Sequence, residues 1–233
     1  NDLVNNLGNL VKRTLDMQKK YFDGVIQTPD TLQPLDDELK AACTAAVDAV
    51  IADMDSFHVA DATEAIFTML RRANKYIDET TPWSLAKDET QRGRLGTVLY
   101  NLLETIRLGA VLLSPFIPDT AKQILTQLNA TPELDALSET AAEIGRENAG
   151  YLLFDRFACG GFGKLKPGVK TGDSKVLFAR IDEKKMLDEL EAERAAAAAE
   201  AAAVAKAADT APEKPEGCAL IGIDDFMNIE LRT

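Results

Sequence analysis

The sequence predicts an all-α protein, an antiparallel helical bundle followed by an irregular arm and a C-terminal linker helix. Apolar residues recur at helical spacing in five stretches of the first 128 residues, and the connections between these stretches are short. Proline marks three of the four connections, where a helix is expected to end. With 46% hydrophobic residues, the chain of 233 residues can bury a core.

The first three predicted helices cover residues 2–21, 36–55 and 59–79. The apolar face of the first consists of Leu3, Leu7, Leu10, Thr14 and Met17. The second begins with Asp36, Asp37 and Glu38, whose charges suit the positive end of a helix dipole. Pro82 ends the third.

Two further helices, at residues 90–113 and 118–128, complete the expected bundle. The longer one carries apolar side chains along its whole length and stops before Ser114-Pro115. The shorter one starts near Pro118, which suits the first turn of a helix. We therefore assign residues 1–158 to the bundle.

The chain changes character after residue 158. Residues 159–183 are rich in Gly and Lys and predict an irregular arm. Residues 184–217 are rich in Ala and Glu, which predicts an exposed helical linker that ends at Pro212 and Pro215. Residues 218–233 alternate apolar and polar side chains, as at the start of a β domain that the chain does not complete. Both ends of the chain resemble cuts.

The net charge of −12 argues against a protein that binds nucleic acid without regard to sequence, because such binding depends on many phosphate contacts. Basic residues are concentrated only in residues 159–185, which carry 7 Lys and Arg against 3 Asp and Glu. Any RNA contact made by the bundle must therefore depend on stacking and on a few well-placed polar groups.

The sequence predicts a soluble, cytoplasmic protein without catalytic or metal-binding residues. No stretch has the roughly 18 to 20 uninterrupted apolar residues of a membrane span, and no basic segment followed by a short apolar run resembles a signal peptide. Cys43, Cys159 and Cys218 are odd in number and far apart, which fits a reducing compartment. The only histidine, His58, has no nearby cysteine or catalytic partner in the sequence.

Trp83 is the most informative side chain because it is the only tryptophan and directly follows Pro82 at a helix end. Proline fixes its own φ angle and disfavours the helical conformation of Thr81, so the indole is expected to be presented at a rigid corner. Such a ring can stack on an unpaired base without net positive charge. The alternative is that Trp83 plugs the end of the bundle.

Asn9 and Arg13 lie four residues apart on the first predicted helix, so their side chains are neighbours on one face. An amide offers both a donor and an acceptor, and a guanidinium offers a planar set of donors. Together they suit the edge of one exposed base. Polar pairs at this spacing also occur on ordinary solvated helix faces.

Several segments, in this order, resemble the anticodon-binding bundle of methionyl-tRNA synthetases. They are residues 6–13 (NLGNLVKR), 73–87 (ANKYIDETTPWSLAK), 114–121 (SPFIPDTA) and 177–182 (LFARID). Residues 223–232 (IDDFMNIELR) resemble the first strand of the OB-fold tRNA-binding domain that some members carry at the C-terminus. The Pro-Trp segment is the most specific signal, since SPFIP also occurs in related class I bundles.

The resemblance implies a fragment that reads the CAU anticodon of methionine tRNA. Trp83 would stack on an anticodon base, and Asn9 and Arg13 would contact the edge of the first base. Asn74 and Asp78 would orient these reading residues. The implied partners are methionine tRNA, the enzyme's own catalytic domain and a second copy bound through the OB-fold domain.

No cofactor is expected in this chain, because it lacks sequences like His-Ile-Gly-His and Lys-Met-Ser-Lys-Ser, with which the family handles ATP. ATP and Mg²⁺ would act in the catalytic domain. Residues 160–165 (GGFGKL) superficially suggest a phosphate loop, but Leu165 stands where such a loop requires Ser or Thr. Two alternatives remain: the bundle of another class I synthetase, and a non-catalytic helical scaffold that binds protein.

Overall fold

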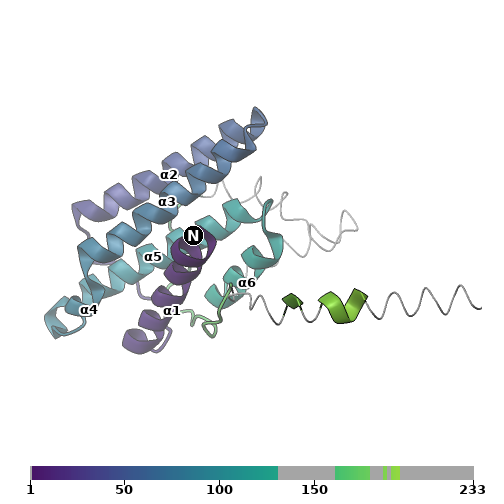
Figure 1. Cartoon of the computed structure of the whole chain (residues 1–233). Helices are drawn as coiled ribbons and strands as arrows, with labels where there is room; N and C mark the ends of the chain where they lie inside the picture. Colours follow the sequence, from purple (N-terminus) through teal and green to yellow (C-terminus); the bar gives the residue numbers. More distant parts are fainter. Residues whose placement is uncertain (1, 131–160, 179–185, 188–189, 195–233) are drawn as a thin grey trace, which may run out of the picture. The chain divides into compact units, whose positions relative to one another are not determined.

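The fold is taken from a computed structural model, in which the described residues are 2–130, 161–178, 186–187 and 190–194 (Figure 1). The chain divides into two compact units, Asn1–Ala179 and Arg180–Thr233. In the second unit, the described residues are helical and exposed. The other residues of the expected linker, and all of the expected β domain, lie outside the described residues.

The first unit is helical, which confirms the predicted fold class. Its elements in chain order are η1 (Asp2–Gly8), α1 (Asn9–Phe22), α2 (Pro34–Asp55), α3 (Val59–Thr80), α4 (Pro82–Leu85), η2 (Glu89–Gln91), α5 (Arg92–Leu113) and α6 (Pro118–Leu128). Among the described residues the only β pairing is one isolated bridge between Val25 and Lys170.

Two details differ from the expected helices. The first helix is not uniform, because Asp2–Gly8 forms a π-helix before α1 begins at Asn9. The short helix α4 and the 3₁₀ turn η2 were not expected, since elements of three or four residues contain no repeating apolar pattern. At the start of α2, Gln33 and Asp36 form a reciprocal capping box, and Pro34 occupies the first turn.

Helix α5 is the centre of the bundle. It contacts α1, α2, α3, α4 and α6, and every residue from Arg94 to Leu113 is buried. Figure 1 shows α2 and α3 as a long antiparallel pair, and these two helices contact each other along their length. A helix that is apolar on all sides must be covered on all sides, which explains why α5 has no solvated face.

Within the described residues, one stretch is long and apolar enough to cross a membrane. This stretch, Glu89–Leu113, includes α5, and its most apolar window is completely buried inside the bundle. Its composition is therefore that of a core helix.

A polar network lies inside the bundle where α2, α3 and α5 meet. The guanidinium of Arg94 donates to both carboxylate oxygens of Asp36, at 2.6 and 2.9 Å, and Tyr76 donates its hydroxyl to the same carboxylate. Burial alone would raise the pKa of Asp36, but the hydrogen bonds from Arg94 and Tyr76 outweigh it and hold the pKa below its usual value. The network ties the C-terminal half of α3 to the first turns of α5.

Candidate nucleic-acid interface

Helix α3 ends at a corner that Thr81 and Pro82 form. Thr81 has φ 41° and ψ 63°, the left-handed conformation, and its N–H donates to the carbonyl of Ile77 at 2.9 Å. We expected Pro82 to disfavour the helical conformation at Thr81, and Thr81 is indeed not helical, although its backbone is left-handed rather than extended. Pro82 then occupies the first position of α4.

Trp83 stands on this corner with 43% of its surface exposed, whereas Pro82 beneath it is buried. This exposure favours an indole that is presented to solvent over one that plugs the end of the bundle. Since α4 is only four residues long and is closed by backbone hydrogen bonds from Ser84 and Leu85 to the Thr81 carbonyl, the ring is carried by a tight local fold. A part of the aromatic surface is open to a ligand.

On α1, Asn9 is exposed and Arg13 is partly buried. Neither side chain forms a hydrogen bond or an ion pair with another described residue. Among the described residues of the first unit, Arg13 is the one arginine without a partner, because each of the others contacts a polar group or an aromatic ring. These are Arg71, Arg72, Arg92, Arg94 and Arg107. The planar donor set of Arg13 is available.

Two contacts tie α1 to the segments on either side of the Trp83 corner. Before Asn9, the carbonyl of Asn6 accepts a hydrogen bond from the Asn74 amide on α3, at 3.1 Å. At the other end of α1, Arg92 of α5 donates to the Tyr21 carbonyl at 3.3 Å. The π-helix η1 is thus bonded to α3 and the end of α1 to α5, and α3 and α5 are the two long helices on either side of α4 in the chain.

Asn74 and Asp78 have different surroundings. The amide of Asn74 also donates to the Leu70 carbonyl, so this side chain fixes the entry to α1 rather than touching Asn9 or Arg13 by a hydrogen bond. Asp78 is exposed and forms no hydrogen bond or ion pair with another described residue. The orienting role of both residues stays a prediction.

The irregular arm contains a cluster that we did not expect from the sequence. Glu104 of α5 is completely buried, and its carboxylate accepts hydrogen bonds from the backbone N–H groups of Gly163, Lys164 and Leu165, at 2.6 to 3.0 Å. Arg107 bonds to the same carboxylate and to the Gly161 carbonyl, at 2.7 and 2.8 Å. The arm is thus attached to the core helix.

This attachment also argues against a phosphate loop at Gly163, Lys164 and Leu165. A phosphate loop offers its backbone N–H groups to an anion. Here the N–H groups of Gly163, Lys164 and Leu165 already bind the Glu104 carboxylate inside the protein. The signal in the sequence was Glu104 itself, the only carboxylate within α5.

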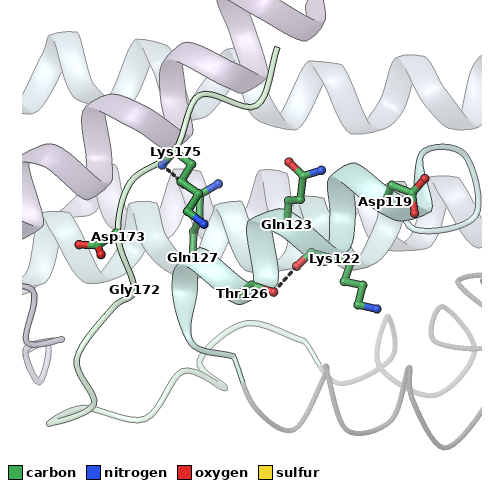
Figure 2. Close-up of a pocket in the computed structure, with 8 residues that line it drawn as sticks. All are labelled: Asp119, Lys122, Gln123, Thr126, Gln127, Gly172, Asp173 and Lys175. Carbon is green, nitrogen blue, oxygen red and sulfur yellow. Dashed lines mark hydrogen bonds between the residues drawn. The ribbon is translucent and has the colours of Figure 1, made fainter. Parts of the chain in front are cut away.

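A pocket of about 650 Å³ lies between α6 and the arm (Figure 2). Its lining residues are Asp119, Lys122, Gln123, Thr126, Gln127, Gly172, Asp173 and Lys175. Each wall contributes one acid and one lysine, so the formal charges cancel, and the lining contains no aromatic ring. The pocket therefore lacks the stacking surface found at Trp83.

The described residues contain no group of His, Cys, Asp and Glu side chains that could hold a metal ion. Cys43 is fully buried, and burial raises the pKa of its thiol to about 11, so the thiolate needed for reactivity is not formed at neutral pH. His58 precedes α3 and caps no backbone group with its side chain.

A helical bundle that holds a partly exposed aromatic ring at a tight corner, and that carries on its first helix an amide and a guanidinium without a polar partner among the described residues, has the features of a domain that binds unpaired bases. A family model described as the anticodon binding domain of methionyl tRNA ligase matches residues 28–153. The chain belongs to this family.

Several relatives and solved structures agree with this assignment. The methionine–tRNA ligase of Clostridium perfringens is 43% identical over 99% of this chain and 32% of its own length, and that of Bacillus subtilis is 33% identical over the same shares. The structure of Mycobacterium tuberculosis methionyl-tRNA synthetase in complex with methionyl-adenylate has a TM-score of 0.61 and 31% identity, over 77% of this chain and 32% of that chain.

The chain spans about a third of the length of the curated relatives it matches. Trp83, Asn74 and Asp78 lie inside the range matched by the family model, whereas Asn9 and Arg13 precede it. The full-length relatives align over 99% of the chain, α1 included. The resemblance to the anticodon-binding bundle of methionyl-tRNA synthetases is thus confirmed.

Proposed function

We propose that this chain recognises the CAU anticodon of methionine tRNA. The observation that carries the proposal is the half-exposed indole of Trp83 on a corner formed by a buried proline, in a member of an anticodon-binding family. Stacking of a base on such a ring contributes about 1–3 kcal/mol. It requires no positive field, which suits a chain with a net charge of −12.

Asn9 and Arg13 supply the selectivity in this proposal. The pairing edge of cytosine combines one amino donor with two acceptors, whereas uracil presents an acceptor where cytosine has its amino group. Arg13 offers donors to the acceptors of cytosine, and the carbonyl oxygen of Asn9 offers an acceptor to its amino group. Support comes from the free state of both side chains among the described residues.

We propose further that the chain works as part of a methionine–tRNA ligase. The attachment of methionine to tRNA, with ATP and Mg²⁺, would take place in the part of the enzyme that corresponds to the unmatched two thirds of the relatives. The cytoplasm is the place where this reaction serves translation. Pairing of two copies through an OB-fold domain belongs to the same proposal, and it concerns residues outside the described ones.

Binding of a CAU stem-loop to the whole 233-residue chain tests the proposal, because Trp83 is the only tryptophan and reports by its own fluorescence. We expect the RNA to quench this fluorescence, and Arg13→Ala to weaken binding about tenfold, as for the loss of a charged hydrogen bond. Lys12→Ala is the matched control, since Lys12 is a neighbouring α1 cation already paired with Asp16.

Three results would count against anticodon recognition. They are an unquenched Trp83, equal losses for Arg13→Ala and Lys12→Ala, and equal affinity for a stem-loop with U as its first anticodon base. The first of these would also favour the remaining alternative, a helical scaffold that binds protein, because such a scaffold has no reason to bring RNA to the indole.

A further inference from the structure

We propose that Thr81 is a positioning residue, which holds Trp83 in its reading orientation through a left-handed backbone conformation. The inference rests on the proposed function and adds to it a residue that does not touch the RNA. It starts from the φ angle of 41° and the ψ angle of 63° at Thr81.

This conformation is unfavourable for threonine. The left-handed region is visited readily by glycine and, among the other residues, mainly by Asn and Asp, while a β-branched residue there is an outlier. Thr81 is one of four non-glycine residues with positive φ among the described residues, together with Asp23, Phe57 and Asn129. It is the only β-branched member of that set and the only one followed by proline.

The surroundings of Thr81 hold it in place from both sides. Its N–H donates to Ile77 and its carbonyl accepts from Ser84 at 2.8 Å, so both of its peptide groups are engaged. Thr80 is buried and donates its hydroxyl to the Tyr76 carbonyl at 2.6 Å. Strained residues persist where the neighbouring structure determines them in this way, and they concentrate at functional sites.

A fixed Thr81 determines where the indole points, because only Pro82 separates the two residues and proline has a fixed φ angle. The left-handed residue sets the angle between α3 and α4, and Trp83 lies in the first turn of α4. A ring that is already oriented loses less freedom when a base stacks on it, which strengthens binding without a new contact.

The chain offers a matched control at the opposite end of α3. Phe57 also has a positive φ, 60°, and is 89% exposed at the connection between α2 and α3. The 22 residues of α3 separate the two positions by roughly 33 Å, at 1.5 Å per residue. Phe57→Gly therefore relieves the same kind of strain far from Trp83.

The experiment compares Thr81→Gly, Thr81→Asn and Phe57→Gly in the whole chain. Thr81→Gly removes the strain and also frees the backbone, whereas Thr81→Asn relieves the strain with a residue that tolerates the left-handed region. We expect both Thr81 variants to melt at or above the wild-type temperature. Thr81→Gly alone should lower the fluorescence anisotropy of Trp83 and weaken CAU stem-loop binding about two- to tenfold, the range for losing one ordered side chain.

The outcomes separate this inference from the proposed function. If the wild-type chain binds no stem-loop, the proposed function fails, while the anisotropy of Trp83 still tests positioning. The inference is overturned if Thr81→Gly leaves anisotropy and affinity unchanged, if its loss of binding comes with a lower melting temperature, or if Phe57→Gly shares the loss.

Discussion

The two buried arginines of α5 and the arginine of α1 differ in how their charges are used. Arg94 and Arg107 are buried, and each binds a carboxylate and a backbone carbonyl inside the protein. Arg13 is only partly buried and has no polar partner among the described residues. The two paired cations are therefore part of the internal structure of the bundle, whereas the guanidinium of Arg13 is the one that we propose meets the RNA.

The largest loss of stability is expected for Arg94→Ala, which breaks the buried ion pair with Asp36. It leaves the buried carboxylate of Asp36 without its charge partner, which costs about 3–5 kcal/mol of stability. Urea unfolding followed by circular dichroism measures the loss. The double variant with Asp36→Leu and Arg94→Met should recover much of the stability, since it removes both charges; a double variant as unstable as Arg94→Ala would contradict this explanation.

Glu104→Gln tests whether the second buried ion pair, Glu104 with Arg107, also stabilises the bundle. The amide keeps one acceptor oxygen but places a donor group among the N–H groups of Gly163, Lys164 and Leu165. We expect a loss of about 1–3 kcal/mol in urea unfolding and faster trypsin cleavage after Lys164. Cleavage at the wild-type rate would mean that Glu104 does not hold the arm.

Acid should lower the stability of the bundle by protonating Asp36. Its pKa is held below the ordinary value of 3.8, so its contribution to stability is complete above that pH and is lost as the pH falls below it. We expect the free energy of unfolding to fall as the pH is lowered from about 5 to about 3, and Asp36→Asn to reduce this dependence. An identical pH profile for Asp36→Asn would contradict the role of the buried pair.

The smallest effect on stability is expected for the exposed cation beside Arg13. Lys12 forms an ion pair with Asp16 at 3.0 Å, and both side chains are about half exposed. Such a pair contributes about 0.3–0.5 kcal/mol on a helix, so Lys12→Ala should shift urea unfolding hardly at all. A loss above about 1 kcal/mol would mean that an exposed cation of α1 stabilises the bundle as the buried arginines do, which would contradict the comparison.

The sequence predicted the long helices because burial on one face leaves a repeating pattern of apolar residues, and burial on all faces, as in α5, leaves a long and largely apolar stretch. It also predicted that the Pro82 corner interrupts the helices and exposes Trp83. The sequence did not predict α4, because an element of four residues is too short to show a repeating apolar pattern. It did not predict the left-handed Thr81 either, because a residue before proline usually has an extended backbone.

Contacts between distant parts of the chain were the second gap. Glu104 and the Gly163 to Leu165 backbone are about 60 residues apart, and no local pattern connects them. A usable signal existed: Arg94, Glu104 and Arg107 are charged residues inside an otherwise apolar helix, where charges survive only when they are paired. The pairing partners, however, follow only from the three-dimensional arrangement.

The most direct test of the central claim is a double-mutant cycle between Arg13 and the first anticodon base. The affinities of the wild-type chain and of Arg13→Ala are measured for stem-loops with C or U at that base, and Lys12→Ala serves as the parallel cycle. We predict a coupling of at least about 1 kcal/mol for Arg13 and none for Lys12. Additive effects at Arg13, with the same preference for C retained by Arg13→Ala, would contradict the assignment of the free guanidinium to reading.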